Sequence, residues 1–582
     1  MKKLRNIIPM LLFPIIILYL FEWYTHNPFT TMKIRIQLLN IVLFELIMAL
    51  LLFLFGKLKT ALRCQTILFM IIGLANYYVL EFRSAPIMPW DILSIGTAAS
   101  VANNFKYTLS KETVFVLIGF VILILLESKA TLELKKDWRI RTGGVLASFA
   151  LLWGFTAMLH QDSTVARFKL YDKLFTPTVM SKRDGTAVAF LMELKYIVVE
   201  KPDGYNKEDA AALLASYDTN DTESATHTPN IIVIMNEAFS DLSVLGDFET
   251  NEDYMPFLHS LMQEGTPNTI SGHLNVSVLG GNTANTEFEF LTGNTMAFLP
   301  QGSVAYQQYV KSNDYSIATY LKSKGYDTIA MHPYNASGWD RDKVYPLLGF
   351  DTFYSLKDWV NPVKIRKYVS DQSCYDKIIE LYEQKDANTP FFLFNVTMQN
   401  HSSYSEEYDN FHPDITVEGT SSKILPNYLS LIKLSDQALC NLIEYFSKAD
   451  EDTVIVFFGD HQPSNSVVAP VWKLNGRSGD SLTEEEEARR YKVPFIIWAN
   501  YDIEAASNVE TSANYLGGHV LRAAGLPLYD YRNYLSQLEG QYPVLTAIRA
   551  ENAQGISTPV KDVKSTLQDY MTLQYYNIFS QK

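Results

Sequence analysis

Cysteine is scarce in this sequence, and basic residues are fewer than acidic ones. The 582 residues include three cysteines, Cys64, Cys374 and Cys440. Although Cys374 and Cys440 could pair, three scattered thiols do not form a disulfide framework, and we expect them to be buried or free. Lysine and arginine number 49 against 63 aspartate and glutamate residues, and the net charge is -14. A chain this acidic lacks the basic face of a general nucleic-acid-binding protein, so that class is excluded.

Long apolar runs are almost absent after residue 160, whereas the part before it contains five. A helix needs roughly 17–25 residues to cross the hydrocarbon core of a bilayer. Four runs are that long, and the remaining one, at 114–126, has lysines near both ends that could reach the interface. We therefore predict a multi-span α-helical membrane domain over residues 1–160. Its predicted spans are Ile7–Trp23, Ile36–Gly56, Cys64–Leu80, Val114–Leu126 and Gly143–Leu159.

Basic residues are unevenly divided between the two sides of these spans. No small-residue cleavage site follows the first span, so we interpret it as a retained anchor with its amino terminus inside the cell. The inside set is then Lys2, Lys3, Arg5, Lys57, Lys59, Arg63, Lys129, Lys135, Lys136, Arg139 and Arg141, and the outside set is Lys33, Arg35, Arg83, Lys106 and Lys111. Because positive charge collects on the cytoplasmic side, everything after residue 160 is predicted to be extracellular.

The rest of the chain divides into a connector, residues 161–229, and a second domain, residues 230–582. The connector contains a predicted helix at Lys207–Tyr217 and a polar linker at Asp218–Thr228. Beyond it, short apolar runs alternate with helical patterns, as they do in βαβ units. The sequence therefore predicts an α/β domain with a mostly parallel central sheet.

Four of the predicted strands are followed by side chains that can bind a metal or a phosphate. In open α/β sheets, binding sites lie outside the carboxyl ends of the strands. One such pair after a strand is weak evidence, but four strands that deliver these residue types to one edge predict a site. Glu237 follows Asn230–Met235, His332 follows Tyr326–Met331, His401 follows Phe391–Val396, and Asp460 and His461 follow Thr453–Phe458.

A glycine-rich segment, Gly280–Phe288, supplies a hydroxyl that could join this site. The glycines followed by Thr283 and acidic and amide residues predict a tight turn into a helix. A hydroxyl at a helix amino terminus lies beside free N–H groups and a positive dipole end, which favours a phosphoryl group. A threonine in this position can also be only a helix cap.

Taken together, Glu237, Thr283, Asp460 and His461 offer three oxygens and one nitrogen to a divalent cation. Mn²⁺ or Mg²⁺ suits this donor set, and Zn²⁺ is possible. A threonine hydroxyl is a poor nucleophile near neutral pH, and coordination to such an ion would lower its pKa. We therefore predict Thr283 as a metal-activated nucleophile.

These motifs resemble the lipoteichoic acid synthase family of the alkaline phosphatase and sulfatase superfamily. The resemblance rests on the strand that ends at Glu237, the Gly-x-Thr segment at Thr283, His401 after a strand, the Gly-Asp-His triplet at 459–461, and the five spans. It implies a sulfatase-like α/β domain in which Thr283 forms a glycerophosphoryl intermediate beside one Mn²⁺. The ligands that it implies are Glu237, Thr283, Asp460 and His461.

The resemblance also implies substrate-binding residues. The family motif of a histidine followed by Trp-x-Arg-Asp is similar to His332 and the run Trp339–Asp342. By this likeness Arg341 holds the phosphate or glycerol, Trp339 forms a wall of the pocket and His401 contacts the phosphoryl oxygens. The chain departs from the family at Tyr334, where the family has an acidic residue, so the glycerol contact differs here.

The function implied by the resemblance is transfer of glycerophosphate from phosphatidylglycerol, through a phosphothreonine, to a glycolipid or polyglycerolphosphate acceptor at the cell membrane. Two alternatives stay open: a glycerophosphate or phosphoethanolamine transferase that decorates a surface glycan, and a non-catalytic membrane protein that binds lipid or glycan. A sulfatase is disfavoured because no cysteine lies near the nucleophile position. A transporter is disfavoured because five spans offer little for a translocation path.

Overall fold

The computed structural model describes residues 4–83, 86–94, 107–134, 137–171, 177–196, 199, 201–218, 227–300, 303–311, 315–479 and 481–580. These residues divide into two compact units. Residues up to 92 and from 107 to 196 form the first unit, and residues from 199 onward form the main part of the second. Most of the predicted linker Asp218–Thr228 and several predicted basic positions (Lys2, Lys3, Lys106, Lys135 and Lys136) lie outside the described residues.

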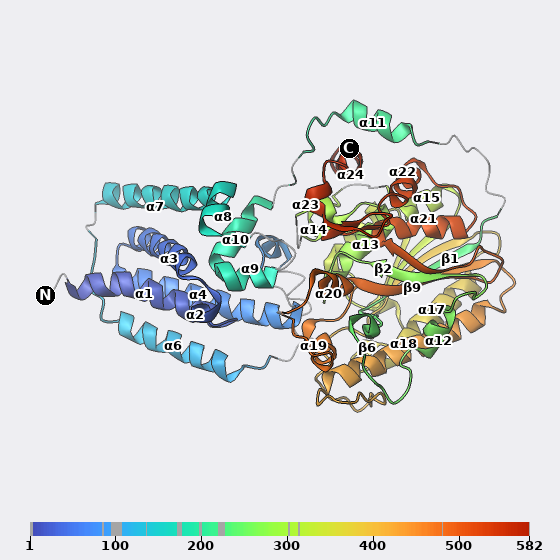
Figure 1. Ribbon diagram of the computed structural model, residues 1–582, viewed down its shortest axis with the longest axis horizontal. Coiled ribbons are helices and arrows are strands. Elements are labelled where there is room, and N and C mark those ends of the chain that lie inside the picture. The colour runs from blue at the N-terminus through green and yellow to red at the C-terminus, as the bar shows by residue number, and fades with distance from the viewer. Residues whose placement is uncertain are drawn as a thin grey trace. The chain divides into compact units, whose positions relative to one another are not determined.

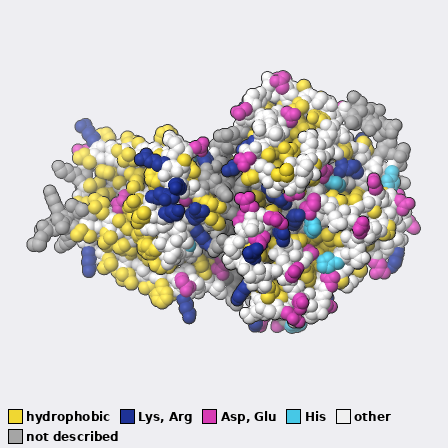
Figure 2. Space-filling model, in the orientation of Figure 1, with side chains coloured by type: hydrophobic (Ala, Val, Ile, Leu, Met, Phe, Trp, Pro, Cys, Tyr) yellow, Lys and Arg dark blue, Asp and Glu magenta, His cyan; other side chains and the backbone are white. Residues whose placement is uncertain are grey.

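The N-terminal unit is helical, and each predicted span coincides with a helix (Figure 1). By length and composition, three helices are apolar enough to cross a membrane: Ile34–Phe55, Leu58–Phe82 and Trp138–Leu159. The other two predicted spans fall on shorter apolar segments. Figure 2 shows apolar side chains spread over the surface of this unit. Its helices are α1 (Leu4–Glu22), α2 (Pro28–Thr31), α3 (Ile34–Phe55), α4 (Leu58–Arg83), α6 (Lys111–Glu127), α7 (Trp138–Leu159), α8 (Asp162–Phe168), α9 (Pro177–Asp184) and α10 (Thr186–Glu193).

The first part of the predicted connector is packed into this N-terminal unit. Gly185, which precedes α10, has no side chain to cap the helix, and the Glu22 carboxylate takes that role. Glu22 accepts hydrogen bonds from the Thr186 backbone N–H at 2.9 Å and from its hydroxyl at 2.9 Å. Asn40 donates to the Asp184 carbonyl at 2.8 Å. The helices α9 and α10 are therefore fixed to α1 and α3 by buried polar contacts.

The C-terminal unit is built on an eight-stranded, mostly parallel sheet, which confirms the predicted fold class. The strand order is β10-β2-β9-β8-β1-β7-β3-β4, and only the pairs of β9 with β2 and with β8 are antiparallel. The predicted strands are all present. They are β1 (Asn230–Asn236), β2 (Thr269–Asn275), β3 (Asp327–His332), β4 (Thr352–Ser355), β7 (Phe391–Val396), β8 (Thr453–Gly459), β9 (Lys492–Ala499) and β10 (Ala506–Ser512).

Helices cover both faces of this sheet (Figure 1). The central strand β1 is buried along its whole length, and its side chains alternate between two apolar cores. Ile231, Val233 and Met235 face one core, and Ile232 and Ile234 face the other. The first core includes α13 (Thr283–Thr292), α15 (Ile317–Ser323), α16 (Arg341–Leu347) and α21 (Ala513–Ala523), and the second includes α12 (Pro256–Leu261), α17 (Asp371–Gln384), α18 (Ile424–Phe446) and α19 (Asn465–Leu474).

Smaller elements complete the C-terminal unit. The predicted helix at 207–217 is α11 (Lys207–Ala215), which packs near α22 and α24. All three cysteines are free, and Cys374 is buried, as the sequence predicted. The remaining elements are α14 (Ala305–Gln308), α20 (Glu484–Arg489), α22 (Asp530–Glu539), α23 (Val560–Val563), α24 (Gln568–Phe579), the hairpin β5 (Lys364–Ile365) and β6 (Tyr368–Val369), and the sheet of β11 (Val544–Leu545), β12 (Arg549–Glu551) and β13 (Ser557–Pro559).

We predict that Gly459, the last residue of β8, tolerates no side chain. A Cβ atom there would lie 2.0 Å from the Phe239 carbonyl oxygen. Gly459→Ala should therefore destabilise the C-terminal unit by about 1–3 kcal/mol, the usual range for overpacking. Gly540→Ala is the matched control, because its Cβ would meet its nearest neighbour at 3.5 Å. Thermal unfolding of the two variants checks this, and equal melting temperatures would contradict it.

Candidate active site

Three of the predicted metal ligands come together at the carboxyl ends of two neighbouring strands. The parallel strands β1 and β8 pair with Asn236 opposite Gly459, so the residues that follow each strand lie side by side. Glu237, Asp460 and His461 each offer a ligand atom, and these atoms lie within 4.8 Å of one another. All three side chains are buried. The tertiary structure therefore forms a cluster of the kind that holds a divalent cation.

Backbone groups orient the ligand atoms of this cluster. Asp460 Oδ1 accepts hydrogen bonds from the backbone N–H groups of Ala238 at 2.7 Å and of His461 at 2.8 Å. His461 Nδ1 donates to the Gln462 carbonyl at 3.0 Å, so that Nε2 is the ring nitrogen that faces Asp460. Asp460 Oδ2 and His461 Nε2 are both buried and lie 3.1 Å apart, and neither atom makes a hydrogen bond to any other described residue. Buried polar atoms without a partner fit a bound cation.

Electrostatics in the cluster also favour a cation. Burial raises the pKa of Glu237 well above its ordinary value, the Asp460 carboxylate raises it further, and Arg341 opposes this effect. Burial likewise raises the pKa of Asp460, which His461 opposes. Two carboxyl groups that share a buried site repel each other once both are ionised. A divalent cation between them would relieve that repulsion, and so these residues fit a metal.

Thr283 lies beside the Asp460 carboxylate as the first residue of α13. Its side chain hydrogen-bonds to Asp460 and lowers the pKa of that carboxyl. Asn282 occupies the N-cap position in a left-handed conformation and makes no side-chain cap hydrogen bond. Thr283 is therefore not the helix cap, and the amino terminus of the ten-residue helix α13 is open. One turn later, the Thr286 hydroxyl donates to the Asp460 carbonyl at 2.8 Å and so fixes the helix to the end of β8.

The two predicted substrate histidines lie at the ends of neighbouring strands: His332 is the last residue of β3, and His401 lies in the loop after β7. Burial lowers the pKa of His332 well below its ordinary value, and nearby Arg341 lowers it further. His332 Nδ1 contacts the Val396 carbonyl at 3.0 Å. Burial lowers the pKa of His401 to about 4, and its Nδ1 contacts the Ser402 carbonyl at 2.9 Å. Both rings are therefore neutral near pH 7, with Nδ1 turned to a backbone carbonyl.

Aromatic rings connect these two histidines. The Tyr334 ring lies 6.2 Å from the His332 ring and 6.3 Å from the Tyr368 ring. The Tyr368 ring lies 5.5 Å from that of His401, and its hydroxyl lies 3.1 Å from His401 Nδ1. Tyr334, where the chain departs from the family pattern, thus belongs to a row of four rings with His332, Tyr368 and His401. Tyr368 was not among the residues predicted from the sequence. Trp339 packs at the edge of the first apolar core in a left-handed conformation.

Arg341 is engaged by a partner that the sequence did not identify. It is buried at the start of α16, and its Nε donates to Glu287 Oε1 at 3.1 Å and to Oε2 at 3.3 Å. Its Nη2 also donates to Glu287, and the Tyr345 hydroxyl donates to Glu287 Oε2 at 2.7 Å. Only Nη1 lies outside this ion pair, 3.5 Å from the Gly338 carbonyl. Phosphate binding by Arg341 stays a prediction, and Nη1 is the atom that would make the contact.

Glu287 lies one helical turn after Thr283, so the two side chains share a face of α13. The four-residue spacing of Thr283 and Glu287 can be seen in the sequence, but nothing in the sequence indicates that Arg341 forms an ion pair with Glu287. The pair connects the helix that begins at Thr283 with the helix that begins at Arg341. It therefore fixes two of the predicted site residues relative to each other.

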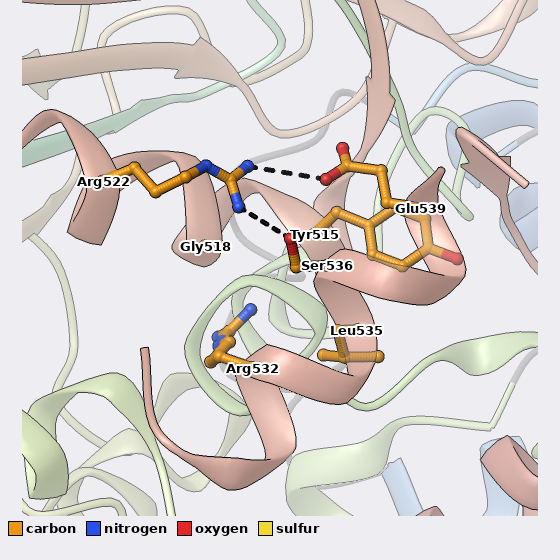
Figure 3. A pocket seen from close by; sticks show the side chains of 7 residues that line it. All are labelled: Tyr515, Gly518, Arg522, Arg532, Leu535, Ser536 and Glu539. Carbon is orange, nitrogen blue, oxygen red and sulfur yellow. Dashed lines mark hydrogen bonds and ion pairs between the residues drawn. The ribbon is translucent and has the colours of Figure 1, made fainter. Parts of the chain in front are cut away.

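A small pocket, drawn in Figure 3, lies between α21 and α22 and contains none of the predicted site residues. Its Arg522 reaches Glu539 at 3.6 Å and the Ser536 hydroxyl at 3.1 Å. Glu539 also accepts from Thr511 at 2.6 Å and contacts His519 at 2.7 Å. The charged groups around this pocket are used in protein contacts, and the buried Tyr515 hydroxyl is without a hydrogen-bond partner among the described residues. One such hydroxyl does not define a site, and so we assign the pocket no ligand.

We predict strong energetic coupling between Glu287 and Arg341. Removing one partner leaves a buried charge without compensation, which destabilises a protein by about 3–5 kcal/mol. Glu287→Gln and Arg341→Met should each be strongly destabilising, and the double variant should be less so than the two effects added. Urea unfolding in a double-mutant cycle measures this. Additive effects would show that the ion pair contributes no coupling.

Comparison with known proteins places these features in a family. The family model Sulfatase matches residues 229–526, just over half of the chain. A putative cyclic beta-1,2-glucan modification protein of Rhizobium meliloti is 29% identical over 427 residues, covering 72% of this chain and 65% of its own length. Lipoteichoic acid synthase 1 of Bacillus subtilis is 26% identical over 278 residues, covering 46% of this chain and 41% of its own length. The chain thus spans less than two thirds of the length of these relatives.

A solved structure shows the same fold. The phosphoglycerol transferase GacH of Streptococcus pyogenes, in complex with sn-glycerol-1-phosphate, superposes with a TM-score of 0.52 and 23% identity, covering 65% of this chain and 94% of that one. The resemblance inferred from the motifs is confirmed at the level of the family. With its mostly parallel sheet and with the buried cluster at the ends of β1 and β8, the chain belongs to the sulfatase family of the alkaline phosphatase superfamily.

Proposed function

We propose that this protein is a membrane-bound, metal-dependent phosphoglycerol transferase that uses Thr283 as its nucleophile. The observation that carries the proposal is the position of Thr283 at the open amino terminus of α13, beside the buried cluster of Glu237, Asp460 and His461. A phosphoryl group bound there would meet free backbone N–H groups and the positive end of the helix dipole. The fold shared with the phosphoglycerol transferase GacH supports the proposal that phosphoryl transfer takes place at this edge of the sheet.

Glu237, Asp460, His461 and the Thr283 hydroxyl would hold one divalent ion. The mixed oxygen and nitrogen set fits Mn²⁺ best by its likeness to the lipoteichoic acid synthase family, with Mg²⁺ and Zn²⁺ as alternatives. When bound, such an ion would lower the pKa of the threonine hydroxyl and neutralise charge on the phosphoryl oxygens.

The proposed transfer has two steps. Thr283 Oγ1 attacks the phosphorus of phosphatidylglycerol, an Oγ1–P bond forms, the bond from phosphorus to the diacylglycerol oxygen breaks, and diacylglycerol leaves with a proton. An acceptor hydroxyl then attacks the phosphothreonine and releases Thr283 as a free hydroxyl. His332, His401 and the Nη1 edge of Arg341 would orient the phosphoryl oxygens. Because both histidines are neutral, they act as hydrogen-bond partners and not as fixed charges.

Two acceptors fit this chemistry. The first is a glycolipid or a growing polyglycerolphosphate, as the likeness to lipoteichoic acid synthases suggests. The second is a surface glycan, which is favoured by the longer and more similar match to a putative glucan modification protein. Sizing the product made from labelled phosphatidylglycerol separates a polymer from a single added group. A phosphoethanolamine donor is the corresponding alternative on the donor side.

We also propose how the chain is arranged at the membrane. Residues 1–160 would form a multi-pass membrane domain, residues 161–229 a connector, and residues 230–582 a catalytic domain outside the cell. The three long apolar helices and the excess of basic residues in the inside segments support this arrangement. Attachment to the membrane would keep the active site close to a lipid donor in the same bilayer.

Thr283→Ala should abolish diacylglycerol release, because it removes the proposed nucleophilic hydroxyl, while the fold is retained. Thr266→Ala, in a surface loop, is the matched control and should keep the activity of the unchanged protein. Diacylglycerol released from labelled phosphatidylglycerol is the measurement. Release at the normal rate by Thr283→Ala would disprove the proposed mechanism.

Metal content should follow the buried cluster. The full-length protein is expected to contain one divalent ion per chain, and Asp460→Asn or His461→Ala should lose it, since each removes a ligand atom from a site with few others. Elemental analysis of purified protein gives the stoichiometry, and the melting temperature should fall on chelation. An ion retained by both variants would place the metal elsewhere.

A further inference from the structure

One loop of the C-terminal unit presents apolar side chains to solvent. Among its described residues, Val360 and Val363 are the most exposed large apolar side chains, with 89% and 66% of their surface accessible. Both lie in the short loop between Asp358 and β5. The next most exposed, Ile556, is 60% accessible and lies on a different turn. Two such side chains three residues apart form a small exposed apolar patch.

The backbone of this loop is held in place, so the exposure is built into the fold. Trp359 is buried and donates to the Ser373 carbonyl at 3.4 Å. Val363 receives the backbone N–H of Ser370 at 2.9 Å and donates its own N–H to the Ser373 hydroxyl at 3.0 Å. Asn361 turns the chain between the two valines in a left-handed conformation. The two valines therefore point outward from an anchored loop.

The loop is basic in a chain that is acidic overall. Lys357 and Lys364 flank the two valines, and neither lysine has an ion pair within the described part of the chain. Asp358, the one acidic residue of the loop, is used to cap its own turn, where it accepts the Ser355 backbone N–H at 2.8 Å. Apolar side chains between lysines fit a surface that is apolar inside and negatively charged outside.

The loop continues into a hairpin that supports the candidate active site. Arg366, at the turn between β5 and β6, donates to the carbonyls of Gln399 at 2.7 Å, His401 at 2.7 Å and Ser403 at 2.6 Å. On the other strand, the Tyr368 hydroxyl reaches His401 Nδ1. Three residues of extended chain, about 10 Å, separate Val363 from Arg366. The apolar loop thus lies close to the rim of the site.

We propose that the loop Lys357–Lys364, called here the docking loop, places the rim of the active site on the surface of an anionic phospholipid bilayer. Val360 and Val363 enter the boundary between headgroups and acyl chains, and Lys357 and Lys364 pair with headgroup phosphates. This proposal rests on the proposed function, because a lipid donor has to leave the bilayer surface and enter the site. A second copy of the chain is a poorer occupant, since a symmetric contact would bring like-charged lysines together.

A quenching experiment tests the contact without any turnover. In full-length protein with Cys64, Cys374 and Cys440 changed to alanine, Val360→Cys carries an environment-sensitive fluorophore, and the protein is placed in nanodiscs with nitroxide-labelled lipid. Strong quenching is expected with phosphatidylglycerol, and weaker quenching with phosphatidylcholine or at high salt. Ile556→Cys, similarly exposed but on another turn, is the matched control. Equal quenching at the two positions, or a signal that depends on protein concentration, overturns the proposal.

An activity experiment separates docking from chemistry. Val360→Asp with Val363→Asp should lower turnover of long-chain phosphatidylglycerol in a bilayer by about tenfold, because a charged loop does not enter the interface. Turnover of a short-chain, monomeric phosphatidylglycerol should stay unchanged. An equal loss with both donors, or no loss with either, overturns the docking role. If the unchanged protein transfers phosphoglycerol from neither donor, the proposed function fails, and the quenching result still decides the docking loop.

Discussion

The parallel pairing of β1 with β8 is the constraint on which the rest of the site depends. It sets Asn236 opposite Gly459, so that Glu237 and Asp460 leave the sheet side by side in a buried environment. Two carboxyl groups in one dry site are unfavourable without a partner of opposite charge. The strands that create this situation are fully buried, and the backbone N–H groups of Ala238 and His461 fix the geometry of Asp460. The fold therefore maintains a strained electrostatic arrangement that a divalent cation would stabilise.

A buried ion pair, between Glu287 and Arg341, fixes the position of the proposed nucleophile Thr283 relative to the predicted phosphate-binding residue Arg341. Glu287 and Arg341 lie on different helices, and their ion pair is completed by the Tyr345 hydroxyl. Buried pairs of this kind contribute little net stability, but they favour one arrangement over others. In this protein that arrangement places Thr283 on one side and the Nη1 edge of Arg341 on the other. Removal of either charge would loosen both helices at the point where they adjoin the site.

The arrangement of the site supports the proposed phosphoryl-transfer chemistry more directly than it supports either proposed acceptor. The family is shown, and the buried cluster and the open helix amino terminus fit phosphoryl transfer. Beside this cluster, Tyr334 and Tyr368 extend a row of rings between His332 and His401.

The sequence by itself determined the elements of the protein. Apolar runs predicted the apolar helices and the buried strands, because composition and period are local properties, and three of the five predicted spans are long and apolar enough to cross a membrane. Glu237, Asp460 and His461 were found because each follows a strand directly. The Glu287–Arg341 pair, the contact of Tyr368 with His401 and the exposed valines at 360 and 363 were decided only in three dimensions. They depend on which strands are neighbours and which helices face each other, and those long-range choices leave no signal in the spacing of residues along the chain.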